Sequence, residues 1–283
     1  MHLKRWITSI VALPLLALLI YKGPPLLFTL FVFVVCILAL LEFFRIVSAR
    51  GTSRGKTISD SGADPRSTLP LPFQALTFAF SAVIFWAAHK RSPEFILHLV
   101  TLNLLVASLL AVSRYKSNRS MLENVFRQAL CMIYIPVCLS YIVLIRNGAG
   151  GIHWTFLLLS TVFAGDISAY YIGSAVGKHK LCPAVSPGKT VEGAIGGIGA
   201  NLAVGSLWKL YSLPAVSWQS CVIFFLLIGL AGQIGDLFES LFKRGADVKD
   251  SGIIVPGHGG MLDRIDAVLF AAPVAYYFKE FMA

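Results

Sequence analysis

The chain has 283 residues, of which 57% are hydrophobic and only 13% are charged. Soluble domains carry about a quarter charged residues, so this composition excludes an ordinary soluble globular protein. The formal net charge is +10 at pH 7, from 24 Lys and Arg against 14 Asp and Glu. We therefore expect an all-α, polytopic integral membrane protein.

Apolar runs long enough to cross a bilayer, roughly 20 residues each, recur from end to end. They predict nine transmembrane helices, at about 6–21, 24–45, 69–88, 94–113, 127–145, 152–174, 191–211, 215–238 and 262–279. Lys4 and Arg5 precede the first run, but no small-x-small cleavage site follows, so we expect a retained helix rather than a signal peptide. We expect one membrane-embedded domain, with an N-terminal transmembrane scaffold at 1–150 and a C-terminal half at 151–283 that carries the chemistry.

The basic residues are unevenly distributed between the predicted loops. If the N-terminus is cytoplasmic, three quarters of the 24 Lys and Arg fall in cytoplasmic segments. Because cytoplasmic loops are enriched in Lys and Arg, this bias predicts an internal N-terminus and an external C-terminus. The basic surplus then serves orientation and attraction to anionic lipid, and it needs no nucleic-acid partner. Residues 51–68, rich in Gly, Ser and Asp, are predicted to form a mobile cytoplasmic loop.

Asp166 lies late in the sixth predicted span, and Tyr170 follows one helical turn later on the same face. Ionisable groups at membrane depth are costly and usually mark a functional site. The alternative is a structural aspartate at a helix end near the cytoplasmic interface.

A second polar element enters the seventh predicted span. Ser186 is expected to cap a helix that begins at Pro187, with Lys189 and Thr190 in its first turn. The free N–H groups and partial positive charge of a helix N-terminus suit phosphate. The alternative is an interfacial helix cap with a snorkelling lysine. Four glycines that favour close helix packing in lipid follow: Gly193, Gly196, Gly197 and Gly199.

The third element is a pair of i, i+3 acidic motifs, Asp236 with Glu239 and Asp263 with Asp266. Each pair lies on one face of its helix, so three or four carboxylates converge if the two helix ends meet. Such a cluster repels itself unless a cation or buried basic partners compensate, and oxygen-only ligands favour Mg²⁺ as that cation. A salt-bridge network between helices is the alternative. Between and within the pairs lie basic residues suited to holding phosphates, namely Lys243, Arg244, Lys249, His258 and Arg264.

This third element resembles the signature of the phosphatidate cytidylyltransferases, also called CDP-diacylglycerol synthases. The signature reads Ser240-x-x-Lys243-Arg244, then Lys249-Asp250-x-Gly252, then Pro256-x-His258-Gly259-Gly260-x-x-Asp263-Arg264-x-Asp266. The segments around Asp166 and from Ser186 to Gly193 also resemble family segments. The resemblance is sharp over about 160–270 and only hydropathic before that.

Two positions depart from the family pattern. Val255 stands where a larger aliphatic residue is usual, which we expect to matter little. Gly188 stands where a second lysine is common, and the loss of a cation near a polyphosphate is expected to weaken nucleotide binding without changing the reaction.

The resemblance implies transfer of CMP from CTP to phosphatidic acid, with CDP-diacylglycerol and pyrophosphate as products. It implies Mg²⁺ as cofactor, leaves open a monovalent cation such as K⁺ beside it, and leaves room for a homodimer. Catalytic roles are implied for Asp236, Asp263, Asp266 and Lys243, and metal binding for Asp236, Asp263, Asp266 and Glu239. Substrate binding is implied for Ser186, Lys189, Thr190, Glu192, Arg244, Lys249, Asp250, His258, Gly259, Gly260, Arg264 and Asp166. The compact size favours a bacterial inner membrane, with the active site facing the cytoplasm.

Two other functions are weighed against this one. A CTP-dependent lipid-alcohol kinase would use similar nucleotide and metal chemistry but would release CDP instead of pyrophosphate. A cation or phosphate transporter would use intramembrane acids as a pathway, but transporters often carry broken helices in both halves. Here the polar residues crowd one half and one predicted membrane face, which disfavours transport.

Overall fold

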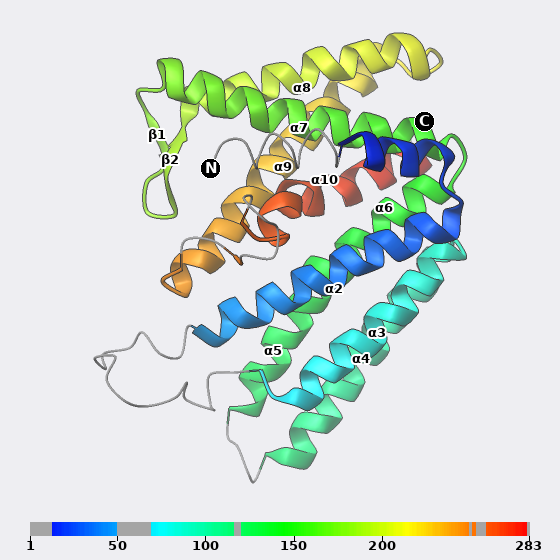
Figure 1. Cartoon of the computed structure of the whole chain (residues 1–283), viewed down its shortest axis with the longest axis vertical. Helices are drawn as coiled ribbons and strands as arrows, with labels where there is room; N and C mark the ends of the chain where they lie inside the picture. Colours follow the sequence, from blue (N-terminus) through cyan, green and yellow to red (C-terminus); the bar gives the residue numbers. More distant parts are fainter. Residues whose placement is uncertain (1–12, 50–68, 116–119, 249–250, 253–258, 282–283) are drawn as a thin grey trace. The chain divides into compact units, whose positions relative to one another are not determined.

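The computed structural model describes residues 13–49, 69–115, 120–248, 251–252 and 259–281. Apart from one two-stranded hairpin, the regular structure of these residues is helical (Figure 1). Six of the described helices are long and apolar enough to cross a membrane, as expected for an integral membrane protein. They are Pro25–Val47, Leu71–His89, Pro93–Arg114, Met121–Asn147, Gly151–Val176 and Trp218–Gly245.

The six helices correspond to six of the nine predicted spans. The predicted span 6–21 overlaps a shorter apolar helix, Leu13–Lys22, and its first residues lie outside the described chain. The predicted spans 191–211 and 262–279 are helices α8 (Val191–Ser212) and α10 (Leu262–Phe281), which are not among the six apolar candidates. The glycines of α8 make that helix less hydrophobic, and three charged residues near the start of α10 have the same effect there. The number nine and the orientation stay predictions, and the loop predicted at 51–68 lies outside the described residues.

The chain divides into two compact units, each discontinuous in sequence. The first comprises Met1–Leu144 and Phe242–Leu262, and the second comprises Ile145–Leu241 and Asp263–Ala283. The segment between the two acidic pairs thus lies with the N-terminal helices. The assignment of scaffold and chemistry to the two halves of the sequence stays a prediction.

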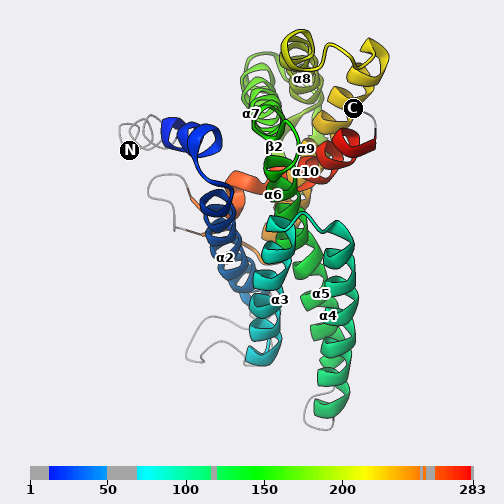
Figure 2. The same ribbon diagram turned by 90° about the vertical axis from the view of Figure 1, so that its right-hand side faces the viewer.

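The helices of the first unit are α2 (Pro25–Ala49), α3 (Leu71–His89), α4 (Pro93–Arg114), α5 (Met121–Met132), the π-helical turn η1 (Ile133–Val137) and the start of α6 (Cys138–Asn147). In Figures 1 and 2, α3, α4 and α5 lie side by side. The amide of Gln128 in α5 donates to Asn103 Oδ1 in α4 at 3.0 Å and to Thr77 Oγ1 in α3 at 3.4 Å. Pro136 lacks an N–H group, which accounts for the π-helical turn between α5 and α6.

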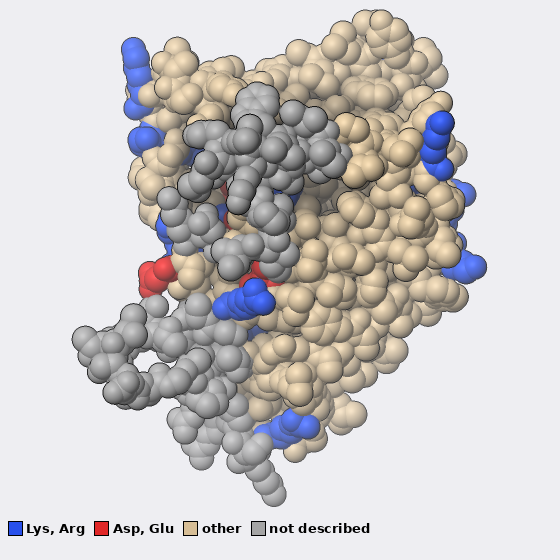
Figure 3. Space-filling model, viewed as in Figure 1, with Lys and Arg blue, Asp and Glu red and all other residues tan. Residues whose placement is uncertain are grey.

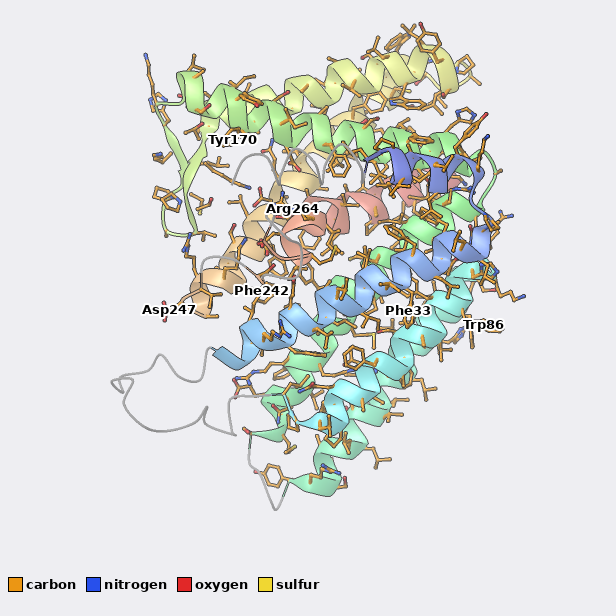
Figure 4. The ribbon with its side chains drawn as sticks, in the orientation of Figure 1. Phe33, Trp86, Tyr170, Phe242, Asp247 and Arg264 are labelled. Atoms are coloured by element: carbon orange, nitrogen blue, oxygen red, sulfur yellow. The ribbon has the colours of Figure 1, made fainter. Side chains whose placement is uncertain are left out.

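An aromatic cluster joins Phe242, the first residue of the Phe242–Leu262 segment, to the other helices of the first unit. Phe242, labelled in Figure 4, packs with its ring centroid 5.1 Å from Phe43 of α2 and 5.7 Å from Tyr134 of η1. Tyr134 and Phe43 are both buried. Aromatic pairs at these separations contribute more stability than the burial of their surface area alone would give.

The second unit contains α7 (Gly151–Val176), strands β1 (Lys180–Cys182) and β2 (Ser186–Thr190), α8, most of α9 (Trp218–Gly245) and α10. Trp154 of α7, Phe224 of α9 and Phe278 of α10 form its aromatic core, and the last two rings stack at 4.0 Å. On both units many large apolar side chains stay exposed, such as Leu109 and Tyr211. Figure 3 shows broad areas without acidic or basic residues, as a lipid-facing surface requires.

Helices α7 and α8 lie side by side (Figure 1) and approach closely through small residues. A Cβ at Gly197 would lie 2.9 Å from Gly165 O and 3.1 Å from Ala169 Cβ. A Cβ at Gly193 would lie 2.6 Å from Ala169 O. These contacts confirm the packing interpretation for Gly193 and Gly197. Gly199 differs, because a Cβ there would meet no atom within 4 Å.

The hairpin corrects the expected start of α8. The prediction of a helix from Pro187 capped by Ser186 is wrong: residues Ser186–Thr190 form β2, which pairs antiparallel with β1, and the helix begins at Val191. The cap is Thr190, whose hydroxyl accepts the Gly193 N–H at 3.1 Å. Pro187 is compatible with this strand because both strands of a two-stranded sheet are edges. Lys189 therefore projects from a strand beside the helix N-terminus and not from a helical turn.

Glu192 closes the base of the hairpin. Its carboxylate accepts the backbone N–H groups of Lys178 at 3.1 Å and His179 at 3.2 Å, and its Oε1 lies 2.6 Å from His179 Nδ1. The carboxylate therefore ties the two ends of the hairpin together.

The α7–α8 contact predicts opposite outcomes for two glycines of one helix. Gly197→Ala should destabilise the protein by roughly 1–3 kcal/mol, because the methyl group meets the backbone of α7. Gly199→Ala should be neutral or slightly stabilising, because alanine favours the helix and the space is open. Thermal unfolding of the two variants in detergent measures the difference. Equal melting temperatures would contradict the close approach.

The contacts of Glu192 predict a local effect of Glu192→Gln. The neutral amide keeps one acceptor oxygen but loses the charge-assisted bonds, so the Lys178 and His179 amides should exchange their hydrogens faster at pH 7. Hydrogen exchange read by mass spectrometry on peptides covering 177–182 checks this. Peptides from α3 serve as the internal control and should be unchanged. Unaltered exchange at the hairpin base would show that the carboxylate does not hold it.

Candidate active site

A cavity of about 430 Å³ lies in the second unit, between α7, the hairpin, the first turn of α8 and α9. Its volume falls within the range of about 300–1,000 Å³ usual for ligand sites. The polar residues that line it are Asp166, Tyr170, Ser174, Ser186, Lys189, Thr190, Gln233 and Asp236. Its other lining residues, all but Leu181 small, are Ala169, Gly173, Leu181, Gly188, Gly193 and Ala194.

Charges of opposite sign face one another in this cavity. Lys189 Nζ of β2 lies 2.5 Å from Asp236 Oδ2 of α9, and Asp166 of α7 lines the same space. Both partners of the ion pair are partly exposed, at 25% for the Lys189 side chain and 34% for that of Asp236. The pair therefore remains accessible to a ligand that offers an anion to the lysine and a cation to the carboxylate.

The N-terminus of α8 opens at the cavity. Thr190 and Gly193, which form its cap, and Ala194 in the next position all line the space. The first N–H groups of a helix lack intrahelical partners and carry partial positive charge, so phosphate is favoured here. A Cβ at Gly188 would meet no atom within 4 Å, so the position where the family often has lysine has room for a side chain.

Gln233 is a cavity residue that the sequence analysis missed. Its Nε2 donates to the Ala194 carbonyl at 2.8 Å, which ties α9 to the first turn of α8. The signal in the sequence was its position three residues before Asp236, on the same helical face. Tyr170, placed on the face of Asp166 by its spacing, also lines the cavity and is labelled in Figure 4.

Five of the predicted site residues meet at this cavity: Asp166, Ser186, Lys189, Thr190 and Asp236. The residues of the same unit that do not line it are Glu192, Glu239, Asp263, Arg264 and Asp266. The predicted residues Lys243, Arg244, Gly259 and Gly260 belong to the first unit. Lys249, Asp250 and His258 lie outside the described residues.

The acidic pairs lie on α9 and α10, and one helix end differs from the prediction. Helix α9 continues to Gly245, past the expected end at 238, so Asp236 and Glu239 lie within a helix and not at its end. Helix α10 begins at Leu262, as predicted. Among the residues that the structure describes, no three His, Cys, Asp or Glu side chains gather closely enough to hold a metal ion together. The metal assignment stays a prediction.

Comparison with known proteins gives the chain its family. The model of the family described as "Cytidylyltransferase family" matches residues 3–282. The phosphatidate cytidylyltransferase of Bacillus subtilis is 42% identical over 149 residues, which are 52% of this chain and 55% of the relative. That of Synechocystis is 45% identical over 134 residues, 47% of this chain and 45% of the relative.

The aligned region spans about half the length of the curated relatives that the chain matches. The family model, by contrast, extends over nearly all of its residues. The chain therefore belongs to the cytidylyltransferase family.

Proposed function

We propose that this protein is a phosphatidate cytidylyltransferase, which transfers CMP from CTP to phosphatidic acid and releases pyrophosphate. The observation that carries the proposal is the cavity in which Lys189 and the N-terminus of α8 face the carboxylates of Asp166 and Asp236. Cationic and carboxylate groups in one pocket suit a nucleotide triphosphate with its metal. The similarity to bacterial phosphatidate cytidylyltransferases supports the choice of phosphatidic acid as acceptor.

The lipid and the nucleotide reach such a site from different sides. We assign nine membrane spans, a cytoplasmic N-terminus and a cytoplasm-facing site in a bacterial inner membrane, on the strength of the Lys and Arg distribution and the bacterial relatives. The hairpin beside the cavity carries Lys180 and Lys189, in keeping with a cytoplasmic face. Phosphatidic acid would then enter laterally from the bilayer, while CTP arrives from the cytoplasm.

The phosphates of the nucleotide are assigned to the cationic side of the cavity. Lys189 offers a point charge, Ser186 and Thr190 offer hydroxyl groups, and the first turn of α8 offers backbone N–H groups. Further phosphate contacts are assigned to the basic residues of the family signature, namely Lys243, Arg244, Lys249, His258 and Arg264. Arg264 is exposed on α10 and is labelled in Figure 4.

The carboxylate side of the cavity fits a magnesium ion. Mg²⁺ is usually held by one or two carboxylates, together with substrate phosphates and water, so the oxygen donors of Asp166 and Asp236 are sufficient. Asp263, Asp266 and Glu239 are assigned as supporting acids, and K⁺ remains a candidate second ion. When bound, Mg²⁺ would neutralise charge on the phosphates that become the leaving pyrophosphate.

The proposed reaction does not require a strong general base from the protein. The second pKa of a phosphate monoester is about 6, so the phosphate of phosphatidic acid is largely ionised at neutral pH. One of its oxygens bonds to the α-phosphorus of CTP, and the bond from that phosphorus to the bridging oxygen breaks to release pyrophosphate. The protein contributes orientation of the two phosphates and stabilisation of the charge that develops between them.

Product analysis tests the proposal directly. Purified protein in micelles containing phosphatidic acid, given α-³²P-labelled CTP and Mg²⁺, should place label in the lipid phase with an equal amount of pyrophosphate. EDTA should abolish the transfer. Appearance of CDP with a lipid alcohol as acceptor would indicate a kinase instead. Failure to form either product would refute both enzymatic readings and favour transport.

The two acidic pairs predict a loss of turnover without a loss of protein. Asp236→Asn and Asp263→Asn should each lower the rate of CMP transfer by about 100-fold or more, because each removes a carboxylate that would help hold the Mg²⁺ that offsets the negative charge of the phosphates. Membrane-integrated protein should stay at the parent level. Glu123→Gln, an exposed acid that pairs with Arg127 in α5, is the matched control and should be fully active. Near-normal turnover in either aspartate variant would remove that residue from the metal assignment.

A further inference from the structure

A carboxylate from the N-terminal part of the chain holds the start of α10. Glu42 of α2 is fully buried, with 0% of its surface exposed. Its Oε1 accepts the Met261 N–H at 3.0 Å, and its Oε2 accepts the Leu262 N–H at 2.8 Å and the Ser251 hydroxyl at 3.2 Å. All of these residues belong to the first unit. One side chain therefore contacts the segment that separates α9 from α10 at two places, at Ser251 within it and at Met261, its last residue.

The physical chemistry of this contact is unusual for a membrane helix. The rest of α2 is almost entirely apolar, and a buried carboxylate is costly unless donors surround it. The first N–H groups of α10 have no partners within their own helix, and a negative charge is favoured beside them. The Glu42 carboxylate thus gives the N–H groups at the start of α10 an acceptor, and these N–H groups give the buried carboxylate its donors.

Two glycines of the family signature leave the space that this carboxylate occupies. A Cβ at Gly252 would lie 2.5 Å from Glu42 Oε1, and a Cβ at Gly260 would lie 2.6 Å from Oε2. Gly259, between them, has a φ of 82°, which glycine adopts readily. Part of the signature therefore serves a contact inside the protein.

We propose that Glu42 is a positioning residue for CMP transfer, which sets the first turn of α10 and with it the places of Asp263 and Asp266. Asp263 follows Leu262 directly and Asp266 lies one turn further along the same helix. A helix is stiff over so short a distance, so fixing its first N–H groups fixes the carboxylates that follow. The inference rests on the function proposed above, because it gives those two aspartates their chemical role.

Activity and folding are measured together in the first experiment. Glu42→Gln keeps the length of the side chain but turns an NH₂ group towards one of the backbone donors. We expect kcat for CMP transfer to fall about 10–100-fold and the Mg²⁺ concentration for half-maximal rate to rise, with the folded fraction at the assay temperature unchanged. Glu123→Gln, the same change at an exposed site, should leave both values at the parent level.

A double-variant cycle separates this contact from general damage. Gly252→Ala should reproduce the loss, because its methyl group displaces the carboxylate. In a Glu42→Ala background the same change should cost little more, because the atoms that it would strike are gone. Additive losses would overturn the proposal, and so would a loss of activity that merely follows the loss of folded protein.

Hydrogen exchange of the Met261 and Leu262 amides supplies a readout that needs no activity. These amides should be protected in the parent protein and exposed in Glu42→Gln. Fast exchange in the parent would overturn the proposal even if the variants fail to fold, and so would full activity in Glu42→Gln. If the parent protein transfers no CMP, the proposed function is refuted, and so is the role of Glu42 as a positioning residue for that reaction. The exchange data would still decide whether Glu42 holds the start of α10.

Discussion

Ionised side chains inside an apolar helical protein must be matched by donors or by opposite charge, and this constraint organises both units. In the first unit, Glu42 is matched by two backbone N–H groups and a hydroxyl group. In the second, Asp236 is matched by Lys189 across a cavity. The two solutions differ in accessibility. The buried contact has the properties of a fixed structural element, whereas the partly exposed ion pair can exchange its partners.

Hydropathy and the polar signature were the parts of this protein that its sequence revealed well. Long apolar runs located the six helices that can span a membrane, because burial in lipid demands some 20 apolar residues whatever the tertiary contacts. The spacing of Asp166 and of the Ser186–Thr190 segment located residues that do meet at one cavity. The family resemblance over the same residues agrees with the family model.

What the sequence did not reveal depends on contacts that its periodicity does not encode. The expected cap at Ser186 was wrong because residues Ser186–Thr190 pair with β1, a strand of three residues with no hydrophobic alternation. The contacts of Glu42 could not be predicted, because its partners lie more than 200 residues away in sequence. Gln233 carried a local signal, its place on the face of Asp236, but amides are common enough in helices to pass unnoticed.

The hairpin start of α8 has a consequence for the chemistry of the cavity. Because Lys189 projects from β2, its ammonium group reaches Asp236 while Thr190 caps the helix independently. The helix N-terminus and the lysine are thus two separate sources of positive charge on the same space. A triphosphate with a bound cation would give both members of the Lys189–Asp236 pair new partners at once. The phosphate would pair with the lysine and the metal with the carboxylate. Ligand entry would then exchange one matched set of charges for another and leave no charge uncompensated, which keeps the electrostatic cost of binding low.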